Sequence, residues 1–261
     1  MKISEIKLRE SFSDGELLTG LPIKIYDETG STNDEAKKFA EEGGDGATRA
    51  IFIAAEQTAG RGRRGRSFLS PEGGLYMSLL LRPSGPLADA VAITTYAAVT
   101  VRRAIAEVAG LDCEIKWVND LLVRGRKLAG ILTEGVLRCD VDTLRYCVVG
   151  IGINLAGDLP PEIADIATSV SAEGSTAGRE ELAARIAELF YSGLGRIGTR
   201  ELADEYRRYC PLIGRDITVM KQSGSYPARV VGITDSCELL LLLPDGSRET
   251  LATGEVSIRE N

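Results

Sequence analysis

Apolar residues change their spacing several times along the first 211 positions. Short apolar runs predict strands, and apolar positions three and four residues apart predict helices. The predicted strands cover residues 21–26, 50–55, 75–81, 113–117, 127–133 and 145–153, and the predicted helices cover 32–42, 91–108, 179–194 and 199–209. We expect the strands at 127–133 and 145–153 to be neighbours in one sheet.

The first predicted helix carries a start signal in its sequence. Thr32-Asn33-Asp34-Glu35 matches a capping box, in which Thr32 caps the helix and Glu35 reaches back to it. The glycines at positions 43 and 44 end the helix. Because helix N-termini attract anions, this segment is also a candidate ligand contact.

The pattern changes after residue 211. Short predicted strands at 217–221, 226–233, 238–243, 249–252 and 256–258 alternate with turn signals such as Pro244-Asp245-Gly246. This arrangement is typical of a small barrel. We therefore expect two domains, one over residues 1–211 and one over residues 212–261.

The composition is that of a globular protein, with 44% hydrophobic and 26% charged residues in a chain of 261. Apolar runs such as Leu239–Leu243 are far shorter than the ~18 residues that a membrane-spanning helix needs, and the first residues lack a signal-peptide core. The five cysteines are an odd number without a Cys-x-x-Cys pair, which suits a reducing compartment and buried thiols. We expect a cytoplasmic protein with no membrane partner.

The chain contains no histidine. This excludes a Ser-His-Asp triad, a Cys-His pair and any imidazole base, so the chemistry has to use carboxylates, lysine, arginine, backbone groups or a bound ion. A formal charge of −7 disfavours binding to nucleic acid, which needs a basic face.

The strongest candidate for chemistry is the tract Gly60–Arg66, with four arginines and three glycines directly after a predicted strand. Glycines let the backbone approach a ligand closely, and arginine offers a fork of donors to phosphate or carboxylate oxygens. The tract therefore predicts a cradle for a small anionic ligand. A solvated basic loop or a nucleic-acid contact remains open on composition alone.

Two further segments are weaker candidates. Lys116-Trp117-Val118-Asn119-Asp120 places a compact cation beside an Asn-Asp pair that could orient groups or meet magnesium, although such a strand end is often purely structural. Gly150 and Gly152 interrupt an apolar strand, which marks either tight packing or a place where a ligand comes close.

Taken together and in this order, the segments resemble the biotin protein ligases, also called biotin–[acetyl-CoA-carboxylase] ligases. The resemblance is carried by Ser31-Thr32-Asn33, Glu56–Arg66, Lys116–Asp120, Lys127–Ile131 and Gly150–Asn154. The arginine-glycine tract combined with Lys-Trp-x-Asn-Asp is highly specific. The segment after residue 211 also looks like the small final domain of this family.

The resemblance implies an α+β fold: a mixed β-sheet flanked by helices, as in class II aminoacyl-tRNA synthetases, with a small C-terminal Src-homology-3-like β-barrel. The implied enzyme uses Mg²⁺ with ATP as its cofactor and joins biotin to ATP, giving biotinyl-5'-AMP and pyrophosphate. It then passes the biotinyl group to one lysine of a biotin carboxyl carrier domain of a carboxylase. We expect the monofunctional type, because the segment before the ligase motifs is too short for the N-terminal DNA-binding domain of bifunctional members.

The resemblance also assigns residues to roles. The implied catalytic residues are Lys116, Arg61 and Arg63. The implied contacts to biotin and its adenylate are Ser31, Thr32, Asn33, Gln57, Gly60, Arg61, Gly62, Arg63, Lys116, Gly130, Ile131, Gly150 and Gly152. The implied nucleotide contacts are Arg63, Arg64, Trp117, Asn119, Lys127 and Asn154, and Asp120 is a candidate magnesium ligand.

Three further expectations accompany the resemblance. If the Gly60–Arg66 loop becomes ordered over the biotinyl-adenylate intermediate, it would exclude water from it. The variant Arg63→Gly should therefore release biotinyl-adenylate into solution. Val118 stands where the family usually has proline, which predicts a looser turn after Trp117. Family members often dimerise through a sheet edge, which leaves a homodimer open.

Other functions remain as alternatives. A lipoate or octanoate ligase would share the fold and the acyl-adenylate chemistry, but its signature is not what the arginine-glycine tract matches. A non-catalytic biotin sensor is disfavoured because Lys116, Asn119 and Asp120 are all present. A nucleic-acid-binding protein is disfavoured by the acidic total charge.

Overall fold

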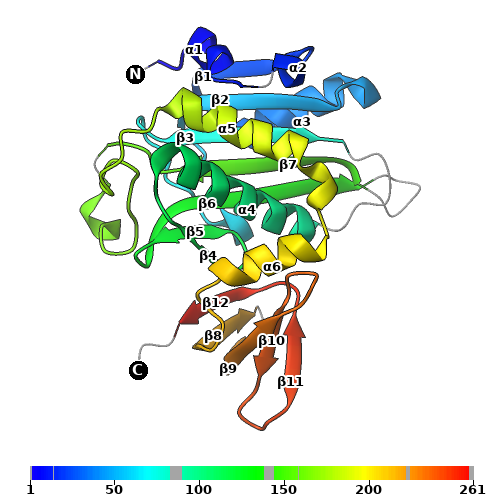
Figure 1. Cartoon of the computed structure of the whole chain (residues 1–261), viewed down its shortest axis with the longest axis vertical. Helices are drawn as coiled ribbons and strands as arrows, with labels where there is room; N and C mark the ends of the chain where they lie inside the picture. Colours follow the sequence, from blue (N-terminus) through cyan, green and yellow to red (C-terminus); the bar gives the residue numbers. More distant parts are fainter. Residues whose placement is uncertain are drawn as a thin grey trace.

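Seven strands form one mixed sheet in the computed structural model, which describes residues 2–13, 15–82, 90–137, 144–157, 159–221 and 224–258 (Figure 1). The strands are β1 (Ile23–Thr29), β2 (Arg49–Gln57), β3 (Leu75–Leu81), β4 (Glu114–Lys116), β5 (Asp120–Val123), β6 (Arg126–Leu137) and β7 (Leu144–Ile153). Their order across the sheet is β1-β2-β3-β7-β6-β5-β4. β1 runs parallel to β2 and the other neighbours are antiparallel. The expected pairing of residues 127–133 with 145–153 is confirmed.

Helices cover both faces of this sheet. Helices α4 (Ala90–Ala109), α5 (Arg179–Ser192) and α6 (Arg200–Tyr209) lie on one side and α3 (Thr32–Glu42) on the other, while α1 (Glu5–Glu10) and α2 (Gly15–Leu18) pack against α5 (Figure 1). Alternate side chains of a strand therefore serve two cores. On β2, Ile51 and Ile53 join the larger core under α4 and α5, whereas Phe52 packs with Ala36 and Ala40 of α3.

Strand β5 is absent from the sequence prediction, which treated residues 121–125 as a loop. β5 pairs with both β4 and β6. Its four residues are too few to show a period. The turn that follows has Arg124 at φ 50° and Gly125 at φ 76°, the left-handed pair that a two-residue hairpin turn requires.

A second sheet follows α6 and lies below the first in Figure 1. Its strands are β8 (Asp216–Lys221), β9 (Gly224–Ile233), β10 (Leu239–Leu242), β11 (Arg248–Leu251) and β12 (Glu255–Ile258), in the antiparallel order β11-β10-β9-β8-β12. In the described part of the chain β11 and β12 do not pair, so the strands form an antiparallel sheet rather than the closed barrel that the sequence suggested. Ile217 and Val219 of β8 join the larger core, which continues across both sheets.

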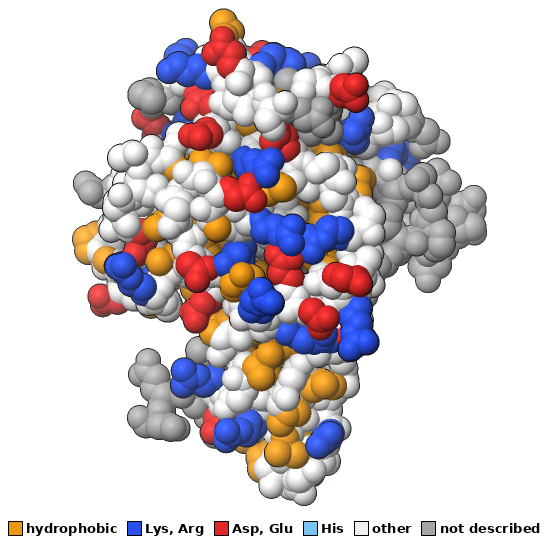
Figure 2. Space-filling model, viewed as in Figure 1, with side chains coloured by type: hydrophobic (Ala, Val, Ile, Leu, Met, Phe, Trp, Pro, Cys, Tyr) orange, Lys and Arg blue, Asp and Glu red, His pale blue; other side chains and the backbone are white. Residues whose placement is uncertain are grey.

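Ion pairs link the helices on the face shown in Figure 2. Glu205 of α6 accepts hydrogen bonds from Arg103 of α4 and from Arg196, and Arg185 of α5 pairs with Glu107 of α4 at 2.5 Å. Acidic and basic side chains are therefore intermixed over this face instead of forming a patch of one sign (Figure 2). Within the described ranges, every helix is too short or too polar to cross a lipid bilayer.

Four cysteines behave as small core residues. Cys113, Cys147, Cys210 and Cys237 are buried and free, as the sequence predicted. Burial raises the pKa of the Cys113 and Cys147 thiols to about 12, because the thiolate would lose its hydration. Cys139 lies outside the described residues.

Candidate active site

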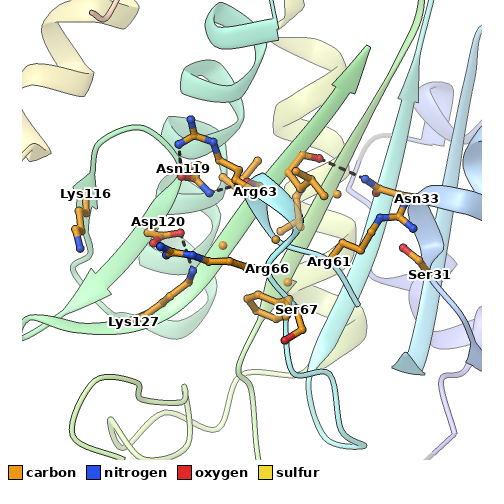
Figure 3. Close-up of a pocket in the computed structure, with 18 of the residues that line it drawn as sticks. Ser31, Asn33, Arg61, Arg63, Arg66, Ser67, Lys116, Asn119, Asp120 and Lys127 are labelled. Atoms are coloured by element: carbon orange, nitrogen blue, oxygen red, sulfur yellow. Dashed lines mark hydrogen bonds and ion pairs between the residues drawn. The ribbon is translucent and has the colours of Figure 1, made fainter. Parts of the chain in front are cut away.

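A cavity of about 310 Å³ opens where the start of α3, the loop after β2, the β4–β5 turn and strands β6 and β7 meet. It gathers sixteen of the residues that the sequence analysis singled out, from segments more than a hundred positions apart (Figure 3). These are Ser31, Thr32, Asn33, Gln57, Arg61, Gly62, Arg63, Lys116, Trp117, Asn119, Asp120, Lys127, Gly130, Ile131, Gly150 and Gly152. Three others, Gly60, Arg64 and Asn154, are outside its lining.

Glycines form part of the floor because neighbouring side chains approach the strands closely. A Cβ at Gly150 would lie 2.4 Å from Oδ1 of Asn33, and one at Gly152 would lie 2.5 Å from the ring of Phe68. Real Cβ contacts are not that short. The two glycines in β7 therefore allow Asn33 and Phe68 to pack tightly against the strand, which is the first of the two readings that their sequence allowed.

The start of α3 differs from the predicted capping box. Ser31, not Thr32, is the N-cap residue, and its side chain makes no capping hydrogen bond. The Thr32 backbone N–H donates to Oε1 of Gln57 at 2.9 Å, and the Thr32 hydroxyl lies 3.1 Å from the same oxygen. Glu35 accepts instead from the hydroxyl of Thr29 at 3.0 Å. The capping box is wrong because tertiary partners outcompete the local ones, and Thr32 instead joins the pocket wall to β2.

The arginine-glycine loop is fastened at several points. Arg61 donates to both carboxylate oxygens of Asp34 at 2.6 Å each, and this pairing raises the pKa of its guanidinium further above the usual range. Arg63 donates to Oδ1 of Asn119 at 3.2 Å and to the carbonyl of Gly254 at 3.3 Å. The loop is therefore tied to α3, to the β4–β5 turn and to the C-terminal sheet.

The two lysines of the pocket have different surroundings. Nζ of Lys127 lies 2.8 Å from Oδ1 of Asp120 and 5.7 Å from the centre of the Phe68 ring. Lys116 lies apart from this pair in Figure 3, and among the described residues its ammonium has no hydrogen-bond or ion-pair partner. Lys116 is therefore a cation that a bound anion could reach without displacing a carboxylate.

The turn between β4 and β5 holds the remaining motif residues. It contains a cis peptide bond between Trp117 and Val118. Nδ2 of Asn119 donates to the carbonyl of Ile131 at 2.9 Å, and the indole N–H of Trp117 donates to the carbonyl of Cys237 at 2.8 Å. The turn that was expected to be looser is thus held to β6 on one side and to the C-terminal sheet on the other.

The residues outside the lining have other neighbours. Gly60 lies behind the pocket, where a Cβ would be 2.4 Å from the carbonyl of Phe68. Arg64, at φ 56°, donates to the carbonyl of Met220 at 3.1 Å. Asn154 borders a second cavity of about 70 Å³, and its Nδ2 donates to the carbonyl of Thr168 at 3.0 Å.

Sequence reasoning missed several lining residues. They are Arg66, Ser67, Phe68, Leu132, Ile151, Met220, Gly254, Val256 and Ser257. Arg66 belongs to the recognised tract, and the aromatic residue two positions later was an available signal. The four residues from the C-terminal sheet carry no local pattern that points to a site.

Comparisons with known proteins agree with this geometry. Residues 30–154 match the model of the biotin/lipoate A/B protein ligase family, and residues 212–259 match the biotin protein ligase C-terminal domain. The chain is 34% identical to the bifunctional ligase/repressor BirA of Bacillus subtilis, over 94% of this chain and 78% of that protein. It is also 34% identical to the biotin–[acetyl-CoA-carboxylase] ligase of Paracoccus denitrificans, over 87% of this chain and 97% of that protein.

A solved structure supports the same assignment. The biotin protein ligase of Aquifex aeolicus, in complex with biotin and ATP, superposes with a TM-score of 0.78 at 26% identity, covering 92% of this chain and 99% of that one. A mixed sheet flanked by helices, a small C-terminal sheet and this pocket define an ATP-dependent ligase. The chain belongs to the biotin protein ligase family, and the expected α+β fold is confirmed.

Proposed function

We propose that the pocket binds biotin and ATP side by side, joins them to biotinyl-5'-AMP with release of pyrophosphate, and passes the biotinyl group to a lysine of a biotin carboxyl carrier domain. The observation that carries this proposal is Lys116, whose ammonium borders the same 310 Å³ cavity as Arg63 and has no partner among the described residues. A compact cation there suits the two anions that the first step brings together.

The end of the pocket beside α3 is assigned to biotin. The Ser31 side chain is buried, borders the cavity and makes no capping hydrogen bond. Its hydroxyl can therefore form a hydrogen bond with a polar atom of the biotin ring. The assigned contacts are Ser31, Thr32, Asn33, Gln57, Gly62, Gly130, Ile131, Gly150 and Gly152, with Gly60 acting from behind through the close packing of the loop.

The opposite end is assigned to the nucleotide. Arg63 and Lys116 would meet phosphate oxygens, and Trp117, Asn119 and Lys127 would surround the rest of the nucleotide. Asn154 and Leu69 border a second cavity, and Leu69 follows Phe68 of the main pocket in the sequence. Asn154 keeps its proposed nucleotide role there, whereas the Met220 contact of Arg64 supports only an indirect role.

The first step has to overcome repulsion between two anions. A carboxylate oxygen of biotin attacks the α-phosphorus of ATP, and the bond from that phosphorus to pyrophosphate breaks. Lys116 and Arg63 neutralise the oxygens that gain charge, and this requires no histidine. In the second step the neutral amine of the carrier lysine attacks the acyl carbon, AMP leaves with the bonding electrons, and the amine releases a proton.

Magnesium belongs to this proposal as the partner of the ATP phosphates. Mg²⁺ is commonly held by one or two carboxylates together with phosphate oxygens. Asp120 offers one carboxylate at the pocket wall, and this carboxylate is paired with Lys127. A single carboxylate fits an ion that arrives bound to the nucleotide. Such an ion withdraws charge from the phosphates. In the described part of the chain, no cluster of three or more His, Cys, Asp or Glu residues could hold a metal alone.

Three further features belong to the proposal. We place the domain boundary at residue 211. We place the protein in the cytoplasm, where the four buried thiols would stay reduced. We also propose a homodimer through β6, because residues 131–137 pair with β7 on one side and, among the described residues, with no strand on the other.

The proposed function is tested by biotin-dependent exchange between ATP and pyrophosphate, with purified protein and magnesium. Exchange that requires biotin and fails with lipoate or octanoate supports the proposal, and biotin transfer to a carrier domain supports its second step. Exchange with lipoate but not biotin would overturn the substrate. The absence of exchange with any of the three acids would favour a non-catalytic sensor.

A further inference from the structure

Glu134 on β6 lies just behind the pocket wall and joins three side chains. Its Oε2 accepts from Nδ2 of Asn33 at 2.7 Å and lies 3.3 Å from Nη2 of Arg61. Its Oε1 accepts from Nζ of Lys37 at 2.6 Å. Glu134 does not itself line the cavity, whereas Asn33 and Arg61 do. The carboxylate therefore contacts pocket residues without facing the pocket.

The contacts continue from Asn33 across the floor of the site. The Ser78 hydroxyl, fully buried on β3, lies 2.6 Å from Oδ1 of Asn33 and 2.7 Å from the hydroxyl of Thr32. The backbone N–H of Thr32 donates to Oε1 of Gln57, which lets the Thr32 hydroxyl donate to Ser78 while Ser78 donates to Asn33, and Nε2 of Gln57 lies 3.1 Å from the hydroxyl of Ser70. One chain of hydrogen bonds thus runs from Glu134 to Ser70.

This chain reaches both ends of the arginine-glycine loop. At the start of the loop, Arg61 is held by Asp34 and Glu134 (Figure 3 shows Arg61 beside Asn33). At its end, the Ser70 hydroxyl donates to the carbonyl of Phe68 at 2.9 Å. The same chain therefore connects the residues assigned to biotin with Arg61 near the start of the loop and with Phe68 just after its end.

We propose that Glu134 is a positioning residue for biotin activation, which fixes Asn33 and the Arg61 end of the loop in one geometry before the ligands meet. This inference rests on the proposed function of the pocket. Glu134 touches neither reactant and acts through Asn33 and Arg61. Its negative charge matters, because two cations and an amide N–H converge on its two oxygens.

The substitution Glu134→Gln separates charge from shape. Glutamine can still accept from Asn33 through its remaining oxygen. Because Asn33 contacts Oε2, the NH₂ group of this glutamine would take the position of Oε1 and face Nζ of Lys37, and two donors cannot bond to each other. Arg61 would keep only a neutral oxygen at 3.3 Å in place of a carboxylate, and its remaining ion pair, with Asp34, is exposed and contributes little.

The experiment compares E134Q with the matched control E41Q. Glu41 lies on α3 and pairs with Arg145 of β7 at 2.7 Å, and it is not among the lining residues of the pocket. In pyrophosphate exchange, E134Q should raise the KM for biotin roughly tenfold and release severalfold more free biotinyl-AMP, while E41Q stays within about twofold of wild type. The thermal unfolding midpoints of E134Q and E41Q are compared to test whether the two substitutions lower stability to a similar extent.

A single variant, Arg61→Met, and a double variant, Arg61→Met with Glu134→Gln, test whether Glu134 acts through Arg61. If Glu134 acts through Arg61, E134Q should raise the KM less in the R61M background than in wild type. Should E134Q fail to fold, D34N removes the other carboxylate from Arg61 at a half-exposed position and should increase adenylate release.

Three results would overturn the inference. They are an E134Q enzyme that matches E41Q in KM and adenylate release, an E134Q effect that is equally large in the R61M background, and a folded D34N enzyme with wild-type release. If the wild-type protein itself shows no biotin-dependent exchange, the proposed function fails first, so the two failures are distinguishable.

Discussion

Arg61 and Asp34 face each other through two nitrogen–oxygen contacts of 2.6 Å each, although they are 27 positions apart in the sequence. The pair joins the first arginine of the loop to the first turn of α3. The sequence favoured anion binding for this arginine, yet its guanidinium is engaged by carboxylates of the protein itself. Among the residues of the pocket, Lys116 and Arg63 are therefore better placed to meet a ligand's charge.

Replacing Lys116 by alanine should lower the rate of biotin-dependent pyrophosphate exchange by ~10²–10³-fold, because the unpaired cation at the pocket is lost. The rate is measured at saturating biotin and ATP. Lys24→Ala serves as the control, because Lys24 is exposed on β1, away from the cavity. Exchange within threefold of wild type in the Lys116 variant would contradict the proposed role.

Replacing Arg63 by glycine should increase the release of free biotinyl-AMP, because the loop loses its contacts with Asn119 and Gly254. Released adenylate is measured by chromatography after a single turnover. Arg124→Gly is a matched control, because it makes the same change in the exposed β5–β6 turn. Equal release from the two variants would rule out a lid role for Arg63.

Tyr206 should tolerate loss of its hydroxyl. Among the described residues this buried hydroxyl has no hydrogen-bond partner, so Tyr206→Phe should leave the free energy of unfolding unchanged or raise it by up to about 1 kcal/mol. Tyr191→Phe should lower it by about 1–2 kcal/mol, because the Tyr191 hydroxyl lies 2.9 Å from the carbonyls of Ala50 and Leu80. Urea titration measures both, and a larger loss in the Tyr206 variant would contradict the assignment.

The buried cysteines predict a decrease in stability at alkaline pH. Burial raises the folded-state pKa of the Cys113 and Cys147 thiols to about 12 from the ordinary value of 9. As the pH rises through 9, the unfolded chain loses these protons before the folded chain does, so the free energy of unfolding falls. Urea midpoints at pH 7.5 and 9.5, measured in a Cys139→Ser variant, test this.

Thiol labelling gives an independent check. In the same Cys139→Ser variant at pH 8, the four remaining cysteines should react with Ellman's reagent only after unfolding, because all four are buried. Rapid labelling of the folded protein would show that the thiols are accessible.

Elements with a strong local pattern were predictable from the sequence. Every residue of β3 is buried and all but Ser78 are apolar or aromatic, so Leu75–Leu81 is recognisable as a buried strand and its predicted bounds match the structure. Strand β5 was missed because four residues show no period. The capping box on Thr32 failed because Gln57 and Ser78, distant in sequence, offer better partners to its hydroxyl.

The candidate site was predictable where a short segment combines unusual residue types. The arginine-glycine tract and Lys116–Asp120 both reach the pocket. Val256 and Ser257 also line it, but only through the packing of β12 beside a loop almost two hundred positions earlier. Ordinary residues become part of a site through tertiary packing alone, which no local pattern encodes.

The contribution of the last strand to the pocket has a consequence for protein synthesis. Gly254 holds Arg63, and Val256 and Ser257 complete the wall. A chain still emerging from the ribosome has the arginine-glycine loop and Lys116 long before it has these residues. The complete pocket is therefore assembled only after β12 has been synthesised and can pair with β8.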